Sequence, residues 1–486
     1  MAASKSRVAL RGYERMASMT PAISRKVAHV LLVHGRDEDS DAVDELLRVL
    51  PAAVARTFNK HPRMRALQLR GEFAAEIQPH VTVPDVDAKQ LLVVLDQDAG
   101  GEWGEYVERE CEVPFDRFQQ FPFFLRVWRG SGATEARFML FSDHYMSDGL
   151  SGVIVLNDIL QEAAELSRSG ENAVAPAEVT LHPSVYELWL NPLRITRAVG
   201  EHLVWLLGRW FFKRDTESFT PLLPPRSDQK HMTVPVTIYN RTRAMFADGS
   251  SEKAPRILAK CKKERASYGA AVMAATAIAY YHTAVIHSAK VDPEHFRMAM
   301  SIDVNLRTRI STPVDEELVG YCVGGTSIAM LATSDGVDLT RSKFWDVARS
   351  IRTELVAATT NDFKMAMSPM FMDQSLHAEA GPDVLGFDVP FAITSDTGIS
   401  SLGRYPYAKS FSLGKSASTL DIESLHFYNP CPCWHPGVVC TSAPWTNSAT
   451  DSRTSTRMLL LRPCSVLLWH WLNVWLTLET KRPCLT

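Results

Sequence analysis

The sequence predicts an α/β protein built from two lobes. Apolar strand-like runs alternate with amphipathic helical patterns in both halves of the chain, and a proline-rich stretch separates the halves. With 486 residues, 46% of them hydrophobic and 22% charged, the chain can bury more than one core. We therefore expect an N-terminal lobe over residues 1–170, a linker over 171–235 and a C-terminal lobe over 236–430.

Composition and charge exclude several classes of function. The formal net charge is -3 and the chain has no dense stripe of lysine and arginine interleaved with aromatic residues, so nucleic acid is not an expected partner. The first 26 residues lack the uninterrupted apolar core of a secretory signal. Cys111, Cys261 and Cys322 are too scattered for a disulfide framework. We expect a cytoplasmic monomer with reduced thiols.

In the first half, residues 26–35 ("KVAHVLLVHG") predict a strand, because a β-branched apolar run ends at a glycine. Residues 39–62 predict an amphipathic helix that ends near His61 and Pro62. The apolar runs 121–130 and 136–144 flank a short loop containing glycine, which predicts a hairpin.

The next segment, residues 147–170, has the apolar spacing of a helix, with Ser147 or Asp148 as its N-cap. The stretch "FMLFSDHYMSDGLSG" at 138–152 therefore runs from a strand into a helix. His144 lies at this junction.

The linker holds the apolar segment "HLVWLLGRWFF" at 202–212, about half of the roughly 20 residues needed to span a bilayer. Its spacing indicates a buried or interfacial helix. A hydrophobic substrate or a peripheral membrane contact would explain it, and so would core packing.

The second half repeats the alternation of elements. Three segments predict strands: 232–242, 296–309 and 418–429. Three predict helices, the second of them apolar nearly all round and hence buried: 251–266, 269–286 and 341–360.

The last segment, 431–486, differs from the rest of the chain, since it holds five of the eight cysteines and five of the eleven tryptophans. We expect an atypical tail that is aberrant or poorly ordered. A zinc site was considered within "CPCWHPGVVC", whose potential ligands are Cys431, Cys433, His435 and Cys440. The usual spacing of two paired knuckles is missing and prolines crowd the stretch, so no metal is expected.

His144 is the candidate catalytic residue. A turn between strand and helix exposes a side chain at the sheet edge, and neutral imidazole can accept a proton near pH 7. Asp148 is too closely tied to the backbone to act as a triad partner, so we expect it to fix the loop through a buried ion pair with a distant arginine. Gly149 would permit close packing or an unusual backbone angle. By spacing alone, His144 could equally satisfy hydrogen bonds at a strand end.

Several stretches resemble, in order, the condensation-domain superfamily of HHxxxDG acyltransferases, which includes chloramphenicol acetyltransferase-like and alcohol acetyltransferase-like enzymes. "DHYMSDG" looks like the signature itself, and the resemblance covers roughly residues 8 to 430. The other stretches that carry it are "LRGYERM", "VARTFNKHPRMRAL", "SIDVNLRTR", "VGYCVGGTSIAM" followed by "SKFWDVARSIR", and "SDTGISSLGRYP" before "LHFYNP".

This resemblance implies two chloramphenicol acetyltransferase-like lobes with a tunnel between them. His144 would be the general base that removes a proton from the acceptor as the acceptor attacks an acyl thioester such as acyl-CoA. The acceptor would be a hydroxyl rather than an amine. Asp148 and Gly149 would support the site, with Arg307 as the ion-pair partner of Asp148. Acyl-CoA would be a co-substrate, and no cofactor is implied.

The sequence departs from the family pattern at two positions and in the tail. Asp143 stands where many members carry the first histidine, and Ser401 replaces a common asparagine. The atypical tail leaves open a degenerate member that binds an acyl carrier, lipid or protein partner without catalysis. No carrier-protein or adenylation signature accompanies the chain, which favours a free-standing acyltransferase over part of a peptide synthetase.

Covalent catalysis is the other alternative. Cys322 lies in an apolar stretch where a buried small side chain is the commoner role, and no nucleophile elbow precedes a helix. His61 and His426 lie at a helix end and in an apolar strand, where capping or core roles are expected.

Overall fold

The fold described here is that of a computed structural model. It describes residues 6–19, 26–36, 41–96, 101–130, 134–170, 175, 177–190, 194–208, 210, 222, 244, 246, 253–286, 291–310, 317–330, 336–375, 395–414, 418–430 and 438–442. The expected strand at 232–242 and the potential zinc ligands Cys431, Cys433 and His435 lie outside the described residues.

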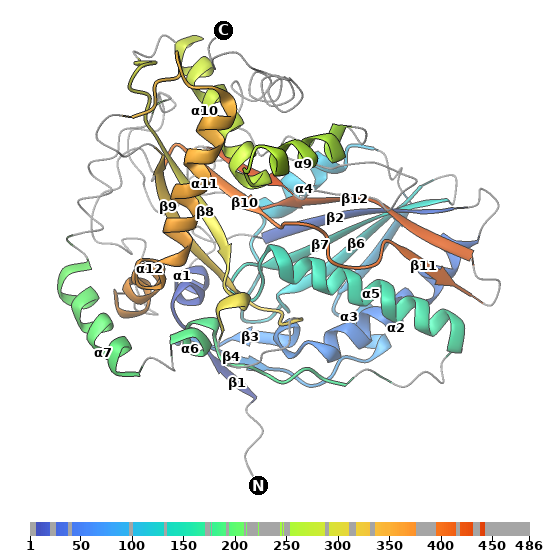
Figure 1. Cartoon of the computed structure of the whole chain (residues 1–486). Helices are drawn as coiled ribbons and strands as arrows, with labels where there is room; N and C mark the ends of the chain where they lie inside the picture. Colours follow the sequence, from blue (N-terminus) through green and yellow to red (C-terminus); the bar gives the residue numbers. More distant parts are fainter. Residues whose placement is uncertain are drawn as a thin grey trace.

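Three sheets organise the described part of the chain (Figure 1). The first lobe is built on a six-stranded sheet, in the order β11 (Ser410–Leu413), β12 (Ser418–Tyr428), β2 (Lys26–Gly35), β7 (Glu135–Asp143), β6 (Phe123–Arg129) and β5 (Leu92–Asp96). The second lobe has a four-stranded sheet, in the order β13 (Val438–Ser442), β10 (Thr397–Ser401), β8 (Met298–Asn305) and β9 (Val323–Met330). A small third sheet joins β1 (Arg7–Ala9), β4 (Ala74–Ile77) and β3 (Ala66–Gln68).

The helices cover these sheets and connect them. Those of the first lobe are α2 (Ala42–Lys60), α3 (Val83–Ala88), α4 (Trp103–Glu112) and α5 (Gly149–Ser169). Around and within the second lobe lie α1 (Tyr13–Met19), α6 (Val185–Leu190), α7 (Arg194–Leu203), α9 (Lys253–Lys263), α10 (Tyr268–Ile286), α11 (Phe344–Thr360) and α12 (Asp362–Ser375).

The first sheet is covered on both faces, as the sequence of β2 requires. Successive side chains of a strand point to opposite faces. Leu31 and Val33 join the core formed with α2 and α5, whereas Ala28 and Val30 join a separate cluster with α4. A strand buried on both faces reads as a continuous apolar run, which explains why "KVAHVLLVHG" lacks a polar alternation.

The helices of the second lobe cover one face of the second sheet. Along β8, the side chains of Met298, Met300 and Ile302 are buried among α10 and α11, while Ala299, Ser301 and Asp303 between them are more exposed. This apolar and polar alternation is typical of a sheet with one face away from its own core. The helix α10 is long and apolar enough to span a membrane, but 72% of its apolar window is buried inside the fold.

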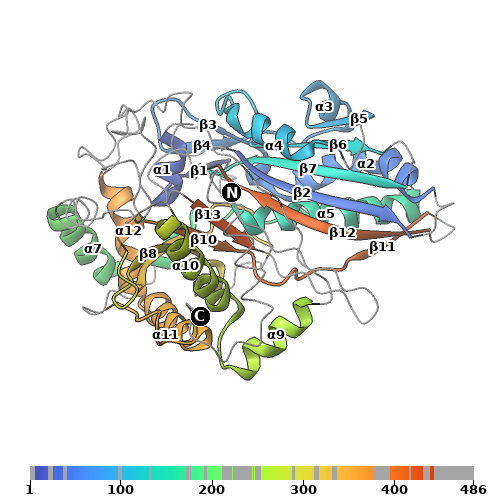
Figure 2. The same ribbon diagram turned by 90° about the horizontal axis from the view of Figure 1, so that it is seen from above.

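One of the expected domain boundaries needs correction. The segment 410–428 was placed in the second lobe, but β11 and β12 belong to the first sheet, where β12 runs antiparallel to β2 (Figure 2). Within 431–486, Val438–Ser442 pair with β10 as the parallel strand β13. The atypical tail stays a prediction. Strand pairing between distant segments decides such contacts, and local composition carries no signal of it.

A histidine of β2 fixes how closely α5 approaches the sheet. His29 is fully buried, and a Cβ at position 152 would lie 2.1 Å from its ring. Only glycine therefore fits at this point of the helix. Burial lowers the pKa of His29 to about 4, so the ring is neutral at neutral pH.

We expect Gly152→Ala to lower the free energy of unfolding by about 1–3 kcal/mol, because the added methyl group overpacks a buried ring. Gly269→Ala is the matched control, since it also lies in a helix but a Cβ there meets no atom within 4 Å. The control should be neutral or stabilising by up to about 1 kcal/mol. Urea unfolding of both variants tests this, and equal midpoints would contradict the packing argument.

Candidate functional site

The loop between β7 and α5 carries the candidate site. It runs from Asp143, the last residue of β7, to Asp148, the N-cap of α5. The Asp148 carboxylate accepts a hydrogen bond from the Ser151 backbone N–H at 2.7 Å, as an N-cap does. Of the two caps expected from the sequence, Asp148 is the one observed.

His144 is held in one orientation by its own loop. Its side chain is partly exposed, while its neighbours Asp143 and Tyr145 are buried. The Nδ1 atom lies 2.8 Å from the backbone oxygen of Ser147. A carbonyl oxygen only accepts hydrogen bonds, so Nδ1 carries the hydrogen in the neutral ring and the lone pair lies on Nε2. The Tyr321 ring stacks on the imidazole with a centroid distance of 4.7 Å.

Asp148 forms a buried ion pair with Arg307. The distances are 2.9 Å from Nη1 to Oδ2 and 3.1 Å from Nη2 to Oδ1. The Cys322 backbone N–H also donates to Oδ2 at 2.9 Å. Burial raises the pKa of Asp148, but Arg307 and the hydrogen-bond donors outweigh this effect and hold the pKa below its usual value.

Arg307 is satisfied on the other side as well. Its Nε and Nη2 atoms donate to the Leu318 backbone oxygen at 2.9 and 2.8 Å. Burial acts to lower its pKa, but the Asp148 carboxylate raises it overall, so the guanidinium stays charged. The pair joins the first turn of α5 in one lobe to the end of β8 in the other.

Gly149 is required by close packing, one of the two roles expected for it. A Cβ at this position would lie 2.5 Å from Cδ2 of Leu402, which follows β10. The Gly149 backbone oxygen lies 2.7 Å from His29 Nε2, so the neutral His29 ring donates to the first turn of α5. Leu402 therefore touches the turn that carries the site.

Asp143, which stands in place of a first histidine, has a structural partner. Arg117 Nε lies 2.7 Å from its Oδ2 and Nη2 lies 2.9 Å from its Oδ1, with both side chains buried. This bidentate pair anchors the start of the loop. Asp143 is therefore buried in its own ion pair. Of the two adjacent residues Asp143 and His144, only His144 has a partly exposed side chain.

The other candidates considered from the sequence occupy buried sites. Burial raises the pKa of the Cys322 thiol to about 12, so a thiolate nucleophile is disfavoured there. His61 Nε2 lies 2.6 Å from Asp158 Oδ2 in the core. His426 is buried on β12, with Nε2 3.1 Å from Ser424 Oγ. Among the described residues, no group of three or more His, Cys, Asp or Glu side chains could hold a metal ion.

A carboxylate missed by the sequence analysis lies beside His144. Asp303 is exposed, yet protein atoms surround it closely enough for burial to raise its pKa, while a hydrogen bond from Ser400 and the nearby His144 act to lower it. The alternation of apolar and polar residues in "MAMSIDVN" indicates that Asp303 lies on the polar face of a strand. It does not indicate which face lies near the histidine.

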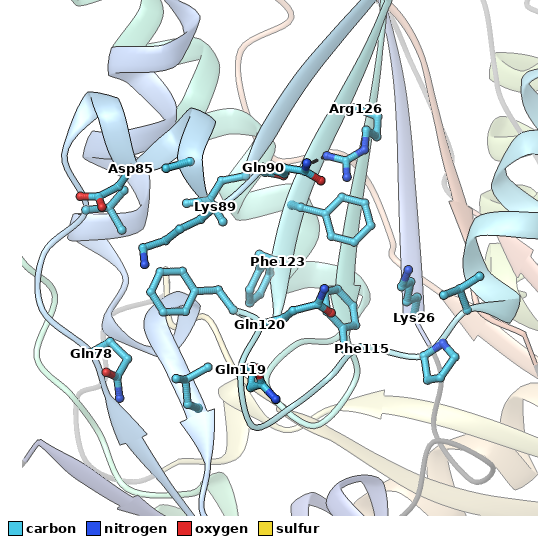
Figure 3. A pocket seen from close by; sticks show the side chains of 18 of the residues that line it. Lys26, Gln78, Asp85, Lys89, Gln90, Phe115, Gln119, Gln120, Phe123 and Arg126 are labelled. Carbon is cyan, nitrogen blue, oxygen red and sulfur yellow. Dashed lines mark hydrogen bonds between the residues drawn. The ribbon is translucent and has the colours of Figure 1, made fainter.

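A separate cavity of about 690 Å³ lies in the first lobe (Figure 3). Phe115, Lys89 and Gln120 are among its lining residues. His144, Asp148 and Arg307 are not, so this cavity is distinct from the candidate site. The tunnel that the resemblance implies stays a prediction.

Comparison with known proteins agrees with this arrangement. The model of the alcohol acetyltransferase family matches residues 123–379, more than half of the chain. The chain belongs to the alcohol acetyltransferase family. The protein is therefore an acyltransferase, in agreement with the family resemblance of its sequence. No curated protein sequence matches the chain.

Solved structures share the fold of this alcohol acetyltransferase family member. The trichothecene 15-O-acetyltransferase from Fusarium sporotrichioides matches with a TM-score of 0.67 at 12% identity, covering 98% of this chain and 96% of that one. The first condensation domain of the calcium-dependent antibiotic synthetase matches at 0.61 and 14%, covering 99% and 98%. Polyketide synthase associated protein 5 from Mycobacterium tuberculosis matches at 0.59 and 13%, covering 97% and 98%. The expected two-lobed α/β fold is thereby confirmed.

We expect Asp148→Ala to lower the free energy of unfolding by about 3–5 kcal/mol, because the buried Arg307 charge loses its counter-ion. Replacing both partners, as Asp148→Ala with Arg307→Met, should cost less than the single change. Asp292→Ala is the control, since its carboxylate is exposed and contacts His295. Chemical denaturation measures all three, and an Asp148→Ala protein as stable as the parent would contradict the assignment.

Proposed function

We propose that the protein is an acyl-CoA-dependent O-acyltransferase with His144 as the general base. The observation that carries this proposal is the hydrogen bond from His144 Nδ1 to the Ser147 backbone oxygen. It leaves the lone pair of Nε2 available on a partly exposed ring, in a protein of an acyltransferase family. The family description and the trichothecene O-acetyltransferase neighbour support a hydroxyl over an amine as the acceptor.

The reaction follows from the position of that lone pair. Nε2 removes the proton of the acceptor hydroxyl as its oxygen attacks the thioester carbonyl, which gives a tetrahedral intermediate. The intermediate collapses and breaks the carbon–sulfur bond, and the protonated His144 returns the proton to the departing thiolate. The products are an ester and free CoA. The Ser147 carbonyl stabilises the imidazolium that forms between the two steps, because Nδ1–H keeps donating to it.

Acyl-CoA as the donor is part of the proposal. A starter condensation domain of rhizomide synthetase shares the fold with a TM-score of 0.61 at 12% identity, and its structure is a complex with C8-CoA. A non-catalytic role is the alternative. The X-domain from teicoplanin biosynthesis has the same fold and is known in complex with the protein OxyB.

We expect His144→Ala and His144→Gln to fold as the parent does and to bind acyl-CoA, but to transfer acyl groups about two to four orders of magnitude more slowly. Glutamine can still donate to the Ser147 carbonyl but cannot accept the proton. His295→Ala, which removes an exposed histidine, is the control. Thiol release from acetyl-CoA with a panel of alcohols measures the rates.

Two outcomes of this experiment count against the proposal. Equal rates for the parent and the His144 variants would remove the histidine from the mechanism. A parent that binds acyl-CoA but transfers to no acceptor would favour the non-catalytic alternative.

We also propose that the protein is cytoplasmic, acts as a monomer and touches membranes peripherally. The free thiols of Cys111, Cys261 and Cys322 suit a reducing compartment. Support for the membrane contact comes from α7 and the π-helical turn Val204–Gly208 that follows it.

Large apolar side chains recur there at the spacing of one helical face and are between 45% and 57% exposed: Val199, Leu203, Leu206, Leu207 and Trp210. Leu203, Leu206, Leu207 and Trp210 belong to the apolar linker segment noted in the sequence, and their exposure supports a contact outside the core. Arg209, Lys213 and Arg214 accompany it in the sequence and would attract anionic headgroups.

We expect the double variant Leu206→Ser with Leu207→Ser to bind vesicles less than the parent, with unchanged acyl transfer to a water-soluble alcohol. Val356→Ser with Phe363→Ser is the control, since these side chains are equally exposed on α11 and α12. Flotation with phosphatidylcholine vesicles, with and without phosphatidylserine, tests this. Equal flotation of the parent and both variants would contradict the assignment.

A further inference from the structure

The exposed face of β8 forms a polar row across the second sheet. Asp303 lies opposite Gly325 of β9 in the antiparallel pairing. On the other side Ile302 lies opposite Ile399 of β10, so the next residue, Ser400, lies beside Asp303. Ile302 and Ile399 point into the core with α10 and α11, and side chains alternate along a strand. Asp303 and Ser400 therefore share the opposite face, where Ser400 hydrogen bonds to the carboxylate.

Aromatic side chains connect this row to the catalytic loop. A Cβ at Gly325 would lie 3.5 Å from the Tyr13 hydroxyl, so the Tyr13 side chain reaches the sheet beside Asp303. The Tyr13 and Tyr321 ring centroids are 6.2 Å apart, and Tyr321 stacks on His144. The row thus lies on the side of the second sheet that faces His144. Arg307, two residues past the end of β8, holds Asp148 and so fixes the two lobes at this point.

The Asp303 carboxylate has acceptor positions that a ligand can use. An ionised carboxylate has about four acceptor positions. Among the described residues, Ser400 is the hydrogen-bond donor recorded for it and no ion pair joins it to a lysine or arginine. An exposed carboxylate is hydrated, and a ligand that donates a hydrogen bond to it takes the place of that water. Its solvent exposure shows that a ligand can reach it.

We propose that Asp303, supported by Ser400, positions the acceptor by accepting a hydrogen bond from a second donor group next to the reacting hydroxyl. The substrate class is then a 1,2-diol or an amino alcohol, and a simple alkanol is a poorer acceptor. Asp303 is a positioning residue in this scheme, because His144 carries out the proton transfer. The inference rests on the proposed function and adds the class of acceptor to it.

The test uses three acceptors of equal carbon number with acetyl-CoA as the donor: a 1-alkanol, the matching 1,2-diol and the matching 2-amino alcohol. The ratio of kcat/KM for the diol over the alkanol should be about ten to one hundred in the parent, the range for a hydrogen bond to a charged group. Asp303→Ala should bring this ratio close to one, because it lowers kcat/KM for the diol much more than for the alkanol. Asp303→Asn should keep part of the preference for the diol but not for the protonated amine.

Controls separate this inference from the proposed function. Asp292→Asn removes an exposed carboxylate from the loop before β8 and should leave every ratio unchanged. Ser400→Ala should reduce the diol preference less than Asp303→Ala does. If the parent acylates alkanols through His144 but the ratio is the same in parent and Asp303→Ala, the positioning role fails and the proposed function stands. Equal losses for all acceptors would also overturn it, since Asp303 would then act on His144 and not on the acceptor. If no acceptor is acylated by the parent, the proposed function itself fails.

Discussion

The buried ion pair between Asp148 and Arg307 is the constraint on which the rest of the site depends. Asp148 caps α5 in the first lobe, and Arg307 follows β8 in the second. Because both charges are buried, separating the lobes would leave each without its counter-ion, which is strongly unfavourable. The pair therefore fixes the first turn of α5 against the second sheet. His144, four residues before Asp148, is positioned by the same contact.

Close packing around the loop makes that position rigid. His29 and Gly152 set the distance between β2 and α5, while Gly149 allows Leu402 to lie on the first turn of the helix. The Asp143–Arg117 pair anchors the start of the loop. A general base needs a fixed tautomer and a fixed direction, and a short loop held at both ends by buried ion pairs provides them. The partly exposed imidazole is thus surrounded by side chains that cannot easily move.

The two sheets contribute to the site in different ways. The first is covered on both faces and acts as a rigid support, and β12 and β11 from a distant part of the chain extend it beyond β2. The second buries one face under α10 and α11 and leaves a polar row on the other. A half-covered sheet can place polar side chains near the histidine without disturbing its own core. Asp303 is the acidic side chain of this row, and its carboxylate has few partners within the described protein.

The sequence by itself determined most of the local structure and identified His144 as the candidate base. Periodicity predicted β2, the β6–β7 hairpin, α2, α5, α10 and α11, because the burial of one or both faces shows directly in the spacing of apolar residues. The order of short motifs predicted the family and singled out His144. What only the tertiary structure decided are contacts between segments far apart in the chain. These include β12 beside β2, β13 beside β10, and the approach of Asp303 to His144. Strand pairing depends on backbone groups that every residue carries, so the local pattern of residues does not show which strands pair. The surroundings of a polar face depend on which lobe it meets, and the local pattern does not show this either.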